Sequence, residues 1–431
     1  MNNVLKKIGN FFKNLWAKIV PFVKKVWAKV LPVLKKIGKA IAKFFGRFKK
    51  AEGFNAFLGA MLAISIGLIM GILLMWIIKP DNATEGITRL IKGTLNNPNG
   101  VKAGIGVLLL SSAPLIFTGL SVAFAFKTGL FNIGASGQYT VGLFCAVLVG
   151  ILGDSLGSFQ WIVAVLAGMA GGFLWGAIPG LFKARYNVHE VITSIMFNYV
   201  GMYLVNGLLT SNFLKTRVVD GSNNRTIKVD QLARTPYGFF DELFPNSGLD
   251  ISILIAIGTA ILIYFLLNKT VFGRELKAVG LNRHAAKYSG VNEKKGIFMS
   301  MAISGMLAGL GGALFILGPN RFNLGNAYAI ENVILTPGFD GIPIALLASS
   351  NPIGVVFATF FVSHIKLAGT AMQSVGFVKE IVDIIIAIIL YFSAFSLILT
   401  QNLGNIKKFF HKFKRKKNTQ DVAFEAKEGD E

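Results

Sequence analysis

A few polar side chains lie inside long apolar stretches of the sequence, and these residues could contact a polar solute. Asn132 and Gln138 stand near the start of one apolar stretch, and Asn198 lies within another. Their amides are neutral donors and acceptors, so they could contact a solute without holding it tightly. Phe131 and Phe339 could offer ring faces to a planar group, although aromatic residues in membrane helices more often serve packing. We expect these residues along a translocation pathway.

Charged side chains also occur within the apolar stretches, where each is costly unless it is paired or in contact with water. Lys366 and Asp383 stand at about the same number of residues on either side of a turn centred near Ser374. In an antiparallel hairpin they would reach similar depth, which predicts an ion pair that joins the two segments. Asp340 lies beside Phe339, and we group it with the translocation pathway.

The sequence contains no pattern typical of a catalytic or metal site. Its four histidines, at positions 189, 284, 364 and 411, are widely scattered, and the single Cys145 lies in an apolar stretch. No G-x-x-x-x-G-K-[ST] loop is present to bind ATP phosphates. We therefore predict no enzyme activity, no metal site and no cofactor in this chain alone.

The composition indicates an all-α polytopic membrane protein. Hydrophobic residues make up 53% of the 431 residues and charged residues 15%, and the mean hydropathy is +0.59. Apolar stretches of bilayer length predict about ten transmembrane helices. They cover residues 57–78, 103–126, 133–152, 159–182, 190–210, 249–268, 297–317, 332–349, 352–370 and 378–400. The eighth, 332–349, is interrupted by proline and glycine, which predicts a discontinuous helix beside a cavity.

The charge distribution predicts the orientation of these spans. Both ends of the chain are basic, and cytoplasmic segments of membrane proteins are enriched in lysine and arginine, so we expect the N-terminus and the C-terminus inside the cell. The basic loop 269–296 then also lies inside. The polar segment 211–248 is expected to lie outside the cell and to form a small extracytoplasmic cap on the transmembrane domain 51–403.

Both terminal segments carry charge that favours anionic lipids. Residues 1–50 contain 14 Lys and Arg and no acid, and residues 404–431 contain 8 Lys and Arg against 5 acids. The 11-residue units FFKNLWAKIVP and FVKKVWAKVLP predict an amphipathic N-terminal arm on the cytoplasmic membrane surface. Residues 404–431 are expected to be a charged cytoplasmic tail. Membrane lipids explain the net charge of +23 better than nucleic acid does.

Four sequence blocks resemble one family of membrane proteins. In the loop 269–296, GRELKAVGLNRHAAKYSGVN resembles the coupling loop of ABC importer permeases of the simple-sugar and nucleoside class. FNIGASGQ is similar to the FNIGAEGQ motif of bacterial nucleoside permeases, with Ser136 in place of the acid. VHEVITSIMFNYV and GFDGIPIALLASSNPIGVV are similar to two further blocks of that branch. The chain therefore resembles the nucleoside branch of the nucleoside and simple-sugar (branched-chain amino acid and ribose type) permease family.

The resemblance implies which residues of the loop contact an ATP-binding subunit. In the family, a short helix bounded by glycines sits in a cleft of the ATP-hydrolysing subunit. In the present sequence, the resemblance assigns this contact to Gly273, Arg274, Glu275, Ala278, Gly280, Asn282, Ala285, Ala286 and Gly290. A basic cytoplasmic loop without a partner would be the simpler interpretation of charge alone.

The resemblance also implies the function and the partners. It implies one half of the transmembrane pore of an ABC importer that takes up nucleosides across a bacterial plasma membrane. The implied partners are an ATP-binding subunit that carries ATP and Mg, a second homologous permease subunit and an extracytoplasmic nucleoside-binding lipoprotein. A monosaccharide of the ribose type is an alternative solute, and an ion-coupled secondary transporter is an alternative class.

Overall fold

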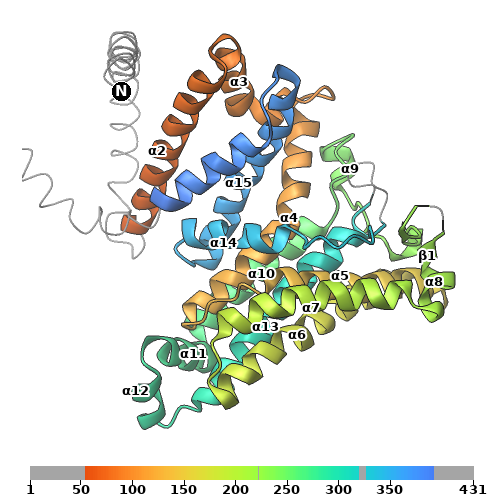
Figure 1. Ribbon diagram of the computed structural model, residues 1–431, viewed down its shortest axis with the longest axis vertical. Coiled ribbons are helices and arrows are strands. Elements are labelled where there is room, and N and C mark those ends of the chain that lie inside the picture. Colours follow the sequence, from red (N-terminus) through yellow and green to blue (C-terminus); the bar gives the residue numbers. More distant parts are fainter. Residues whose placement is uncertain (1–53, 222, 320–326, 393–431) are drawn as a thin grey trace, which may run out of the picture. The chain divides into compact units, whose positions relative to one another are not determined.

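The structure is a computed structural model that describes residues 54–221, 223–319 and 327–392 (Figure 1). Within this part, eight helices are long and apolar enough to cross a membrane. They are α2 (Phe54–Ile78), α4 (Val101–Lys127), α5 (Ala135–Leu152), α6 (Gln160–Tyr186), α7 (Glu190–Thr210), α10 (Ser252–Lys269), α13 (Glu293–Leu317) and α15 (Pro352–Met372). The two-residue strands β1 (Val219–Asp220) and β2 (Arg225–Thr226) form a small hairpin. The all-α prediction is confirmed.

Two of the ten predicted spans differ from the rest. The predicted span 332–349 contains only the short helix α14 (Pro337–Leu347), which follows a non-helical segment. The predicted span 378–400 is helical from residue 380 to 392, where the described part of the chain ends. The arm 1–50 and the tail 404–431 lie outside the described residues, and the orientation of the spans stays a prediction.

Helix α13 forms the centre of the bundle and packs against α4, α5 and α6. Its contact with α6 is made by glycines. A Cβ added at Gly172 of α6 would lie 2.3 Å from the carbonyl oxygen of Gly305, and one added at Gly309 would lie 2.5 Å from the carbonyl oxygen of Gly168. Since lipid tails give apolar helices little reason to associate, close backbone approach through small residues is a main source of helix–helix attraction in membranes.

The linker between α2 and α4 is folded. Helix α3 (Pro80–Lys92) and the short η1 (Gly93–Asn96) lie against the end of α15 and the turn η5 (Gln373–Val375). Lys79 and Asn82 donate side-chain hydrogen bonds to the carbonyls of Gly376 and Val375. These bonds connect the first described helices to the last ones.

The segment 211–248, predicted as a cap, contains α8 (Asn212–Val218), the β-hairpin, η3 (Gln231–Ala233) and α9 (Phe240–Leu243). Val229 and Phe240 are buried, and the Asp230 N–H donates to the carbonyl of Gly150 at the end of α5. A short helical loop stands on the opposite ends of the spans, in α11 (Val271–Leu281) and α12 (Arg283–Tyr288), as Figure 1 shows.

Candidate functional site

The polar residues that the sequence places on a translocation pathway meet in the centre of the bundle. The Asn132 amide donates to Gln138 Oε1 at 2.7 Å and to Ser304 Oγ of α13 at 2.7 Å. The Gln138 amide donates back to Asn132 Oδ1 at 3.1 Å, and Ser121 of α4 hydrogen bonds to Ser304. All four side chains are buried. Paired in this way, the amides hold the non-helical residues before α5 against α4 and α13.

Asn198 of α7 also holds the start of α5 in place through hydrogen bonds. Its Oδ1 accepts from the Gly137 N–H at 2.7 Å, and its Nδ2 donates to the carbonyl of Ile133 at 3.1 Å. This amide therefore satisfies two backbone groups at the start of α5 that the helix itself leaves unpaired. Asn132, Gln138 and Asn198 make these bonds within the described chain, so their visible role is to position α5, and their contact with a solute stays a prediction.

Helix α14 docks onto this junction through its glycines. A Cβ at Gly338 would lie 2.3 Å from Ser136 Cα, and one at Gly341 would lie 2.4 Å from the carbonyl oxygen of Thr118 in α4. The Ser136 hydroxyl donates to the carbonyl of Leu335 just before α14. A small side chain at position 136 thus permits the close approach of α14. The sequence showed that Ser136 replaces the acid of the family motif, but it did not show this contact.

The two aromatic candidates lie at the edges of the junction. The Phe131 ring stacks on Phe126 with centroids 5.0 Å apart, which accounts for Phe131 by packing. Phe339 is partly exposed at the first turn of α14. Three of the four sequence blocks thus converge, because α5, α7 and α14 each bring one motif to the same place, while the fourth block lies in the loop of α11 and α12.

The intramembrane charges pair differently from the prediction. Lys366 Nζ lies 2.5 Å from Asp340 Oδ1, so the acidic partner of Lys366 is Asp340 and the predicted pair with Asp383 is wrong. The prediction that α15 and the following helix pack against each other as a hairpin is consistent with the structure, since a Cβ added at Gly369 would lie 2.7 Å from the side chain of Val382. Successive helical side chains point about 100° apart, however, so Val382 faces α15 while Asp383 is exposed.

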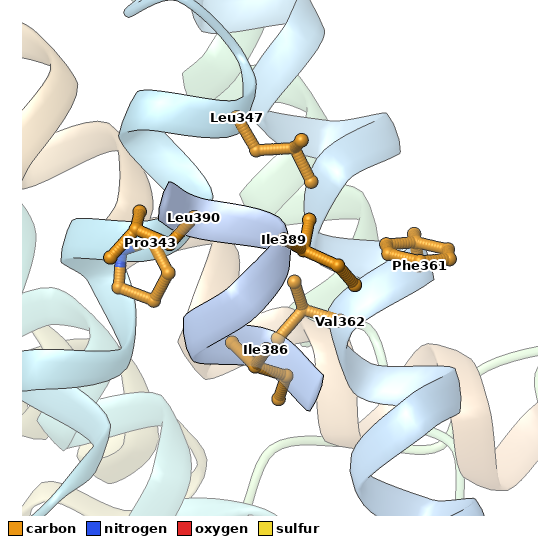
Figure 2. Close-up of a pocket in the computed structure, with 7 residues that line it drawn as sticks. All are labelled: Pro343, Leu347, Phe361, Val362, Ile386, Ile389 and Leu390. Atoms are coloured by element: carbon orange, nitrogen blue, oxygen red, sulfur yellow. The ribbon is translucent and has the colours of Figure 1, made fainter. Parts of the chain in front are cut away.

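Apolar side chains fill the space beside this ion pair. Figure 2 shows a pocket between α14, α15 and the helix that begins at residue 380, lined by Pro343, Leu347, Phe361, Val362, Ile386, Ile389 and Leu390. Since these side chains offer no hydrogen-bonding groups, the pocket does not supply a polar site. The ion pair that α14 forms within the described part of the chain is that of Asp340 with Lys366.

We expect Lys366→Met and Asp340→Asn each to destabilise the protein, and the double variant to recover most of the loss. Removing one partner of a fully buried pair costs about 3 to 5 kcal/mol because a charge is left unpaired. Here the side chains keep 29% and 19% of their exposure, so we expect a smaller loss, about 1 to 2 kcal/mol. Thermal unfolding in detergent measures it, with Asp383→Asn as the silent control. Additive losses would contradict the pair.

The loop predicted to contact an ATPase forms two short helices with well-defined ends. Thr270 Oγ1 accepts from the Gly273 N–H, Asn282 Oδ1 accepts from the Ala285 N–H, and Asn292 Oδ1 accepts from the Lys295 N–H. Each of these side chains caps the start of a helix, in α11, α12 and α13 respectively. The sequence thus specifies three helix starts within one short segment.

The loop is fixed to the bundle by contacts of its inner face. A Cβ at Gly280 would lie 2.5 Å from the backbone of Thr128, and Gly129, at φ +75°, has the left-handed conformation that glycine favours. Arg283 forms a salt bridge with Glu293 at 2.6 Å and donates to Asn187 Oδ1 at 3.0 Å. A small apolar cluster lies beneath, made of Leu130, Ala184, Val279, Ala286, Ile297 and Met301.

The predicted coupling residues therefore divide into three groups by exposure. Gly273 and Ala286 are buried, Ala278 and Gly280 are partly buried, and Arg274, Glu275, Asn282, Ala285 and Gly290 are exposed. Two exposed apolar residues escaped the sequence prediction, Leu281 at 88% and Tyr288 at 94% exposure. The signal for Leu281 was available, because it is out of phase with the buried pair Leu276 and Val279. We define the outer surface of the loop as Leu281, Ala285 and Tyr288.

A mainly helical bundle with spans of membrane length and close helix contacts through small residues defines a multi-pass membrane protein. The chain belongs to the branched-chain amino acid transport system / permease component family, whose model matches residues 104–394.

Three relatives are ABC transporter permeases. The chain is 36% identical to the guanosine ABC transporter permease protein NupP of Bacillus subtilis, over 81% of this chain and 96% of that protein. It is 32% identical to the nucleoside ABC transporter permease protein NupB of Lactococcus lactis, over 80% and 93%. It is 26% identical to a second Bacillus subtilis protein, the guanosine ABC transporter permease protein NupQ, over 59% and 77%. No solved structure matches.

Proposed function

We propose that this chain is the transmembrane permease subunit of an ABC importer that takes up nucleosides. The observation that carries the proposal is the match to a guanosine permease along almost the whole of that protein. The relative at 32% identity is named a nucleoside permease as well. The convergence of three motif blocks, on α5, α7 and α14, supports the same assignment, since the similarity covers the interior of the bundle.

The partners follow from the class of transporter. Two different Bacillus subtilis guanosine permeases, NupP and NupQ, resemble this chain, which supports a complex of two homologous permease subunits. A separate ATP-binding subunit would carry ATP and Mg and would contact the outer surface of the loop 269–296. A nucleoside-binding lipoprotein would deliver solute at the segment 211–248. The basic arm 1–50 would contact membrane lipids.

The contacts of the loop suggest how a movement driven by ATP hydrolysis would be transmitted from the loop to the centre of the bundle. A displacement of α11 and α12 acts on the turn after α4 through the contact of Gly280 with Gly129. It also acts on the connection between α6 and α7 through the bond from Arg283 to Asn187. The turn after α4 leads within three residues to Asn132, which holds the start of α5. Both routes use side chains and backbone that are in direct contact.

The test is purification of the complex followed by uptake competition. We expect an ATP-binding subunit and a second permease to copurify with this chain, and unlabelled guanosine or uridine to suppress uptake of a labelled nucleoside while ribose does not. Suppression by ribose alone would favour the monosaccharide alternative. Uptake that survives loss of the ATP-binding subunit and collapses with an uncoupler would indicate an ion-coupled transporter.

A further inference from the structure

The residues just before α14 form a non-helical segment, bent at Asn332 and Val333, that contacts α7 near both of its ends. At one end, Asn206 Nδ2 of α7 donates to the carbonyl of Glu331 at 2.8 Å and to Asn332 Oδ1 at 3.2 Å. At the other end, the Leu335 carbonyl accepts from Ser136, whose neighbour Gly137 donates to Asn198 of α7. The segment is thus held at both ends by polar contacts.

These contacts place the segment deep within the spans. Asn198 and Asn206 are eight residues apart on α7, which is roughly 12 Å along the helix axis. The five residues from 331 to 335 connect the contact at Asn206 with the junction beside Asn198, so the segment lies beside this part of α7. Since Asn198 is eight residues inside α7, the far end of the segment lies roughly 12 Å from the helix start at Glu190.

The N–H groups of this segment, unlike several of its carbonyls, lack hydrogen bonds at that depth. Among the described residues, the N–H groups of positions 332 to 336 have no hydrogen-bond acceptor within reach. Asn332, Val333 and Thr336 are exposed on the surface of the chain. Unpaired backbone groups do not face lipid, because each would cost several kcal/mol there, and irregular backbone at membrane depth occurs where protein covers it or where it lines a water-filled cavity.

Polar groups surround the segment on the sides that are described. Tyr328 Oη donates to Asn206 Oδ1 at 3.1 Å. One helical turn beyond Thr336 stands the ion pair of Asp340 and Lys366. The segment therefore offers several N–H donors that have no partner among the described residues, with charged groups at one end.

We propose that residues 332–336 form a wall of the solute pathway, where backbone N–H groups and the Thr336 hydroxyl hydrogen bond to oxygens and ring nitrogens of the passing nucleoside. The proposal deepens the proposed function and rests on it for the class of solute. Ribose hydroxyls, base carbonyls and ring nitrogens are acceptors that match these N–H donors. Coverage by the second permease subunit is the competing explanation for the exposed backbone, and the test separates the two.

The test is thiol accessibility in the assembled transporter, in membranes, with Cys145 first changed to alanine. Val333→Cys and Thr336→Cys are treated with a charged methanethiosulfonate reagent, which reacts only with thiols that water reaches. Leu262→Cys on α10 is the matched control, because Leu262 is 60% exposed and Val333 is 64% exposed in the chain. We expect both pathway variants to react at least tenfold faster than the control, guanosine to slow the reaction, and modification to stop uptake.

Each other outcome has a defined meaning. Unreactive thiols at both positions would show that protein or lipid covers the segment, and the wall would be ruled out. Fast reaction that no nucleoside slows, in a complex that still imports nucleosides, would also rule out the wall while the proposed function stands. Slowing by ribose or another solute, with no nucleoside import, would keep the wall and overturn the proposed substrate class.

Discussion

Replacing Gly172 with leucine is expected to prevent correct folding of the protein. The Cβ of residue 172 would lie 2.3 Å from the Gly305 carbonyl oxygen and 2.7 Å from Gly309 Cα, and backbone atoms cannot move away as a flexible side chain can. Helices α6 and α13 would have to separate, although α13 is the most buried of the eight candidate spans. We expect loss of monodisperse protein in detergent, measured by size-exclusion chromatography.

The matched control is Gly258→Leu in α10. Gly258 is also a helical glycine in a membrane span, but no atom lies within 4 Å of the position of its Cβ. Because leucine favours the helical conformation more than glycine does, by roughly 0.8 kcal/mol, this variant is expected to fold with normal yield. Equal behaviour of the two variants would show that close α6–α13 packing is not required for the fold.

Replacing Leu281 and Tyr288 together with alanine is expected to reduce solute-stimulated ATP hydrolysis by roughly 30-fold or more without unfolding the permease. Both side chains are almost fully exposed in this chain, and anchors of an interface each typically contribute about 2 kcal/mol or more. The measurements are ATPase activity of the purified complex, with and without nucleoside, and the melting temperature of the permease.

Val271→Ala serves as the control for this second prediction, since Val271 is an exposed apolar residue at the other end of α11. Gly280 is unsuitable as a site for this test. Its Cβ would meet the backbone of Thr128 and Gly129, so a bulky residue there would displace the loop as well as any partner. Normal coupling in the double alanine variant would remove Leu281 and Tyr288 from the interface.

The sequence predicted the class of fold and most spans because apolar stretches of bilayer length have few alternatives to a membrane helix. It failed where the outcome depends on which face of a helix meets a neighbour. Lys366 and Asp383 were matched in depth correctly, yet Asp383 faces outward and Asp340 of α14 takes its place. No periodicity of α15 or of the following helix indicates that α14 inserts there.

The candidate site shows the same limit. Asn132, Gln138 and Asn198 were identified because amides are rare in apolar stretches, but their hydrogen bonds to Ser304, Gly137 and Ile133 depend on tertiary contacts. The non-helical residues 332–336 were interpreted as part of a broken span because of the proline and glycine residues that follow, but those residues lie within α14 and the interruption precedes them. Their missing backbone hydrogen bonds only became visible with the neighbours in place.

The glycine contact between α6 and α13 restricts the movements available to this protein. Where backbones touch through Gly172, Gly305 and Gly309, no layer of flexible side chains is present that could repack as the helices slide. Helices α6 and α13 are therefore expected to move as one rigid body during a transport cycle. Alternating access would then arise from displacement of this body against its surroundings, with α14 and the second permease as the moving boundary, and not from rearrangement within its centre.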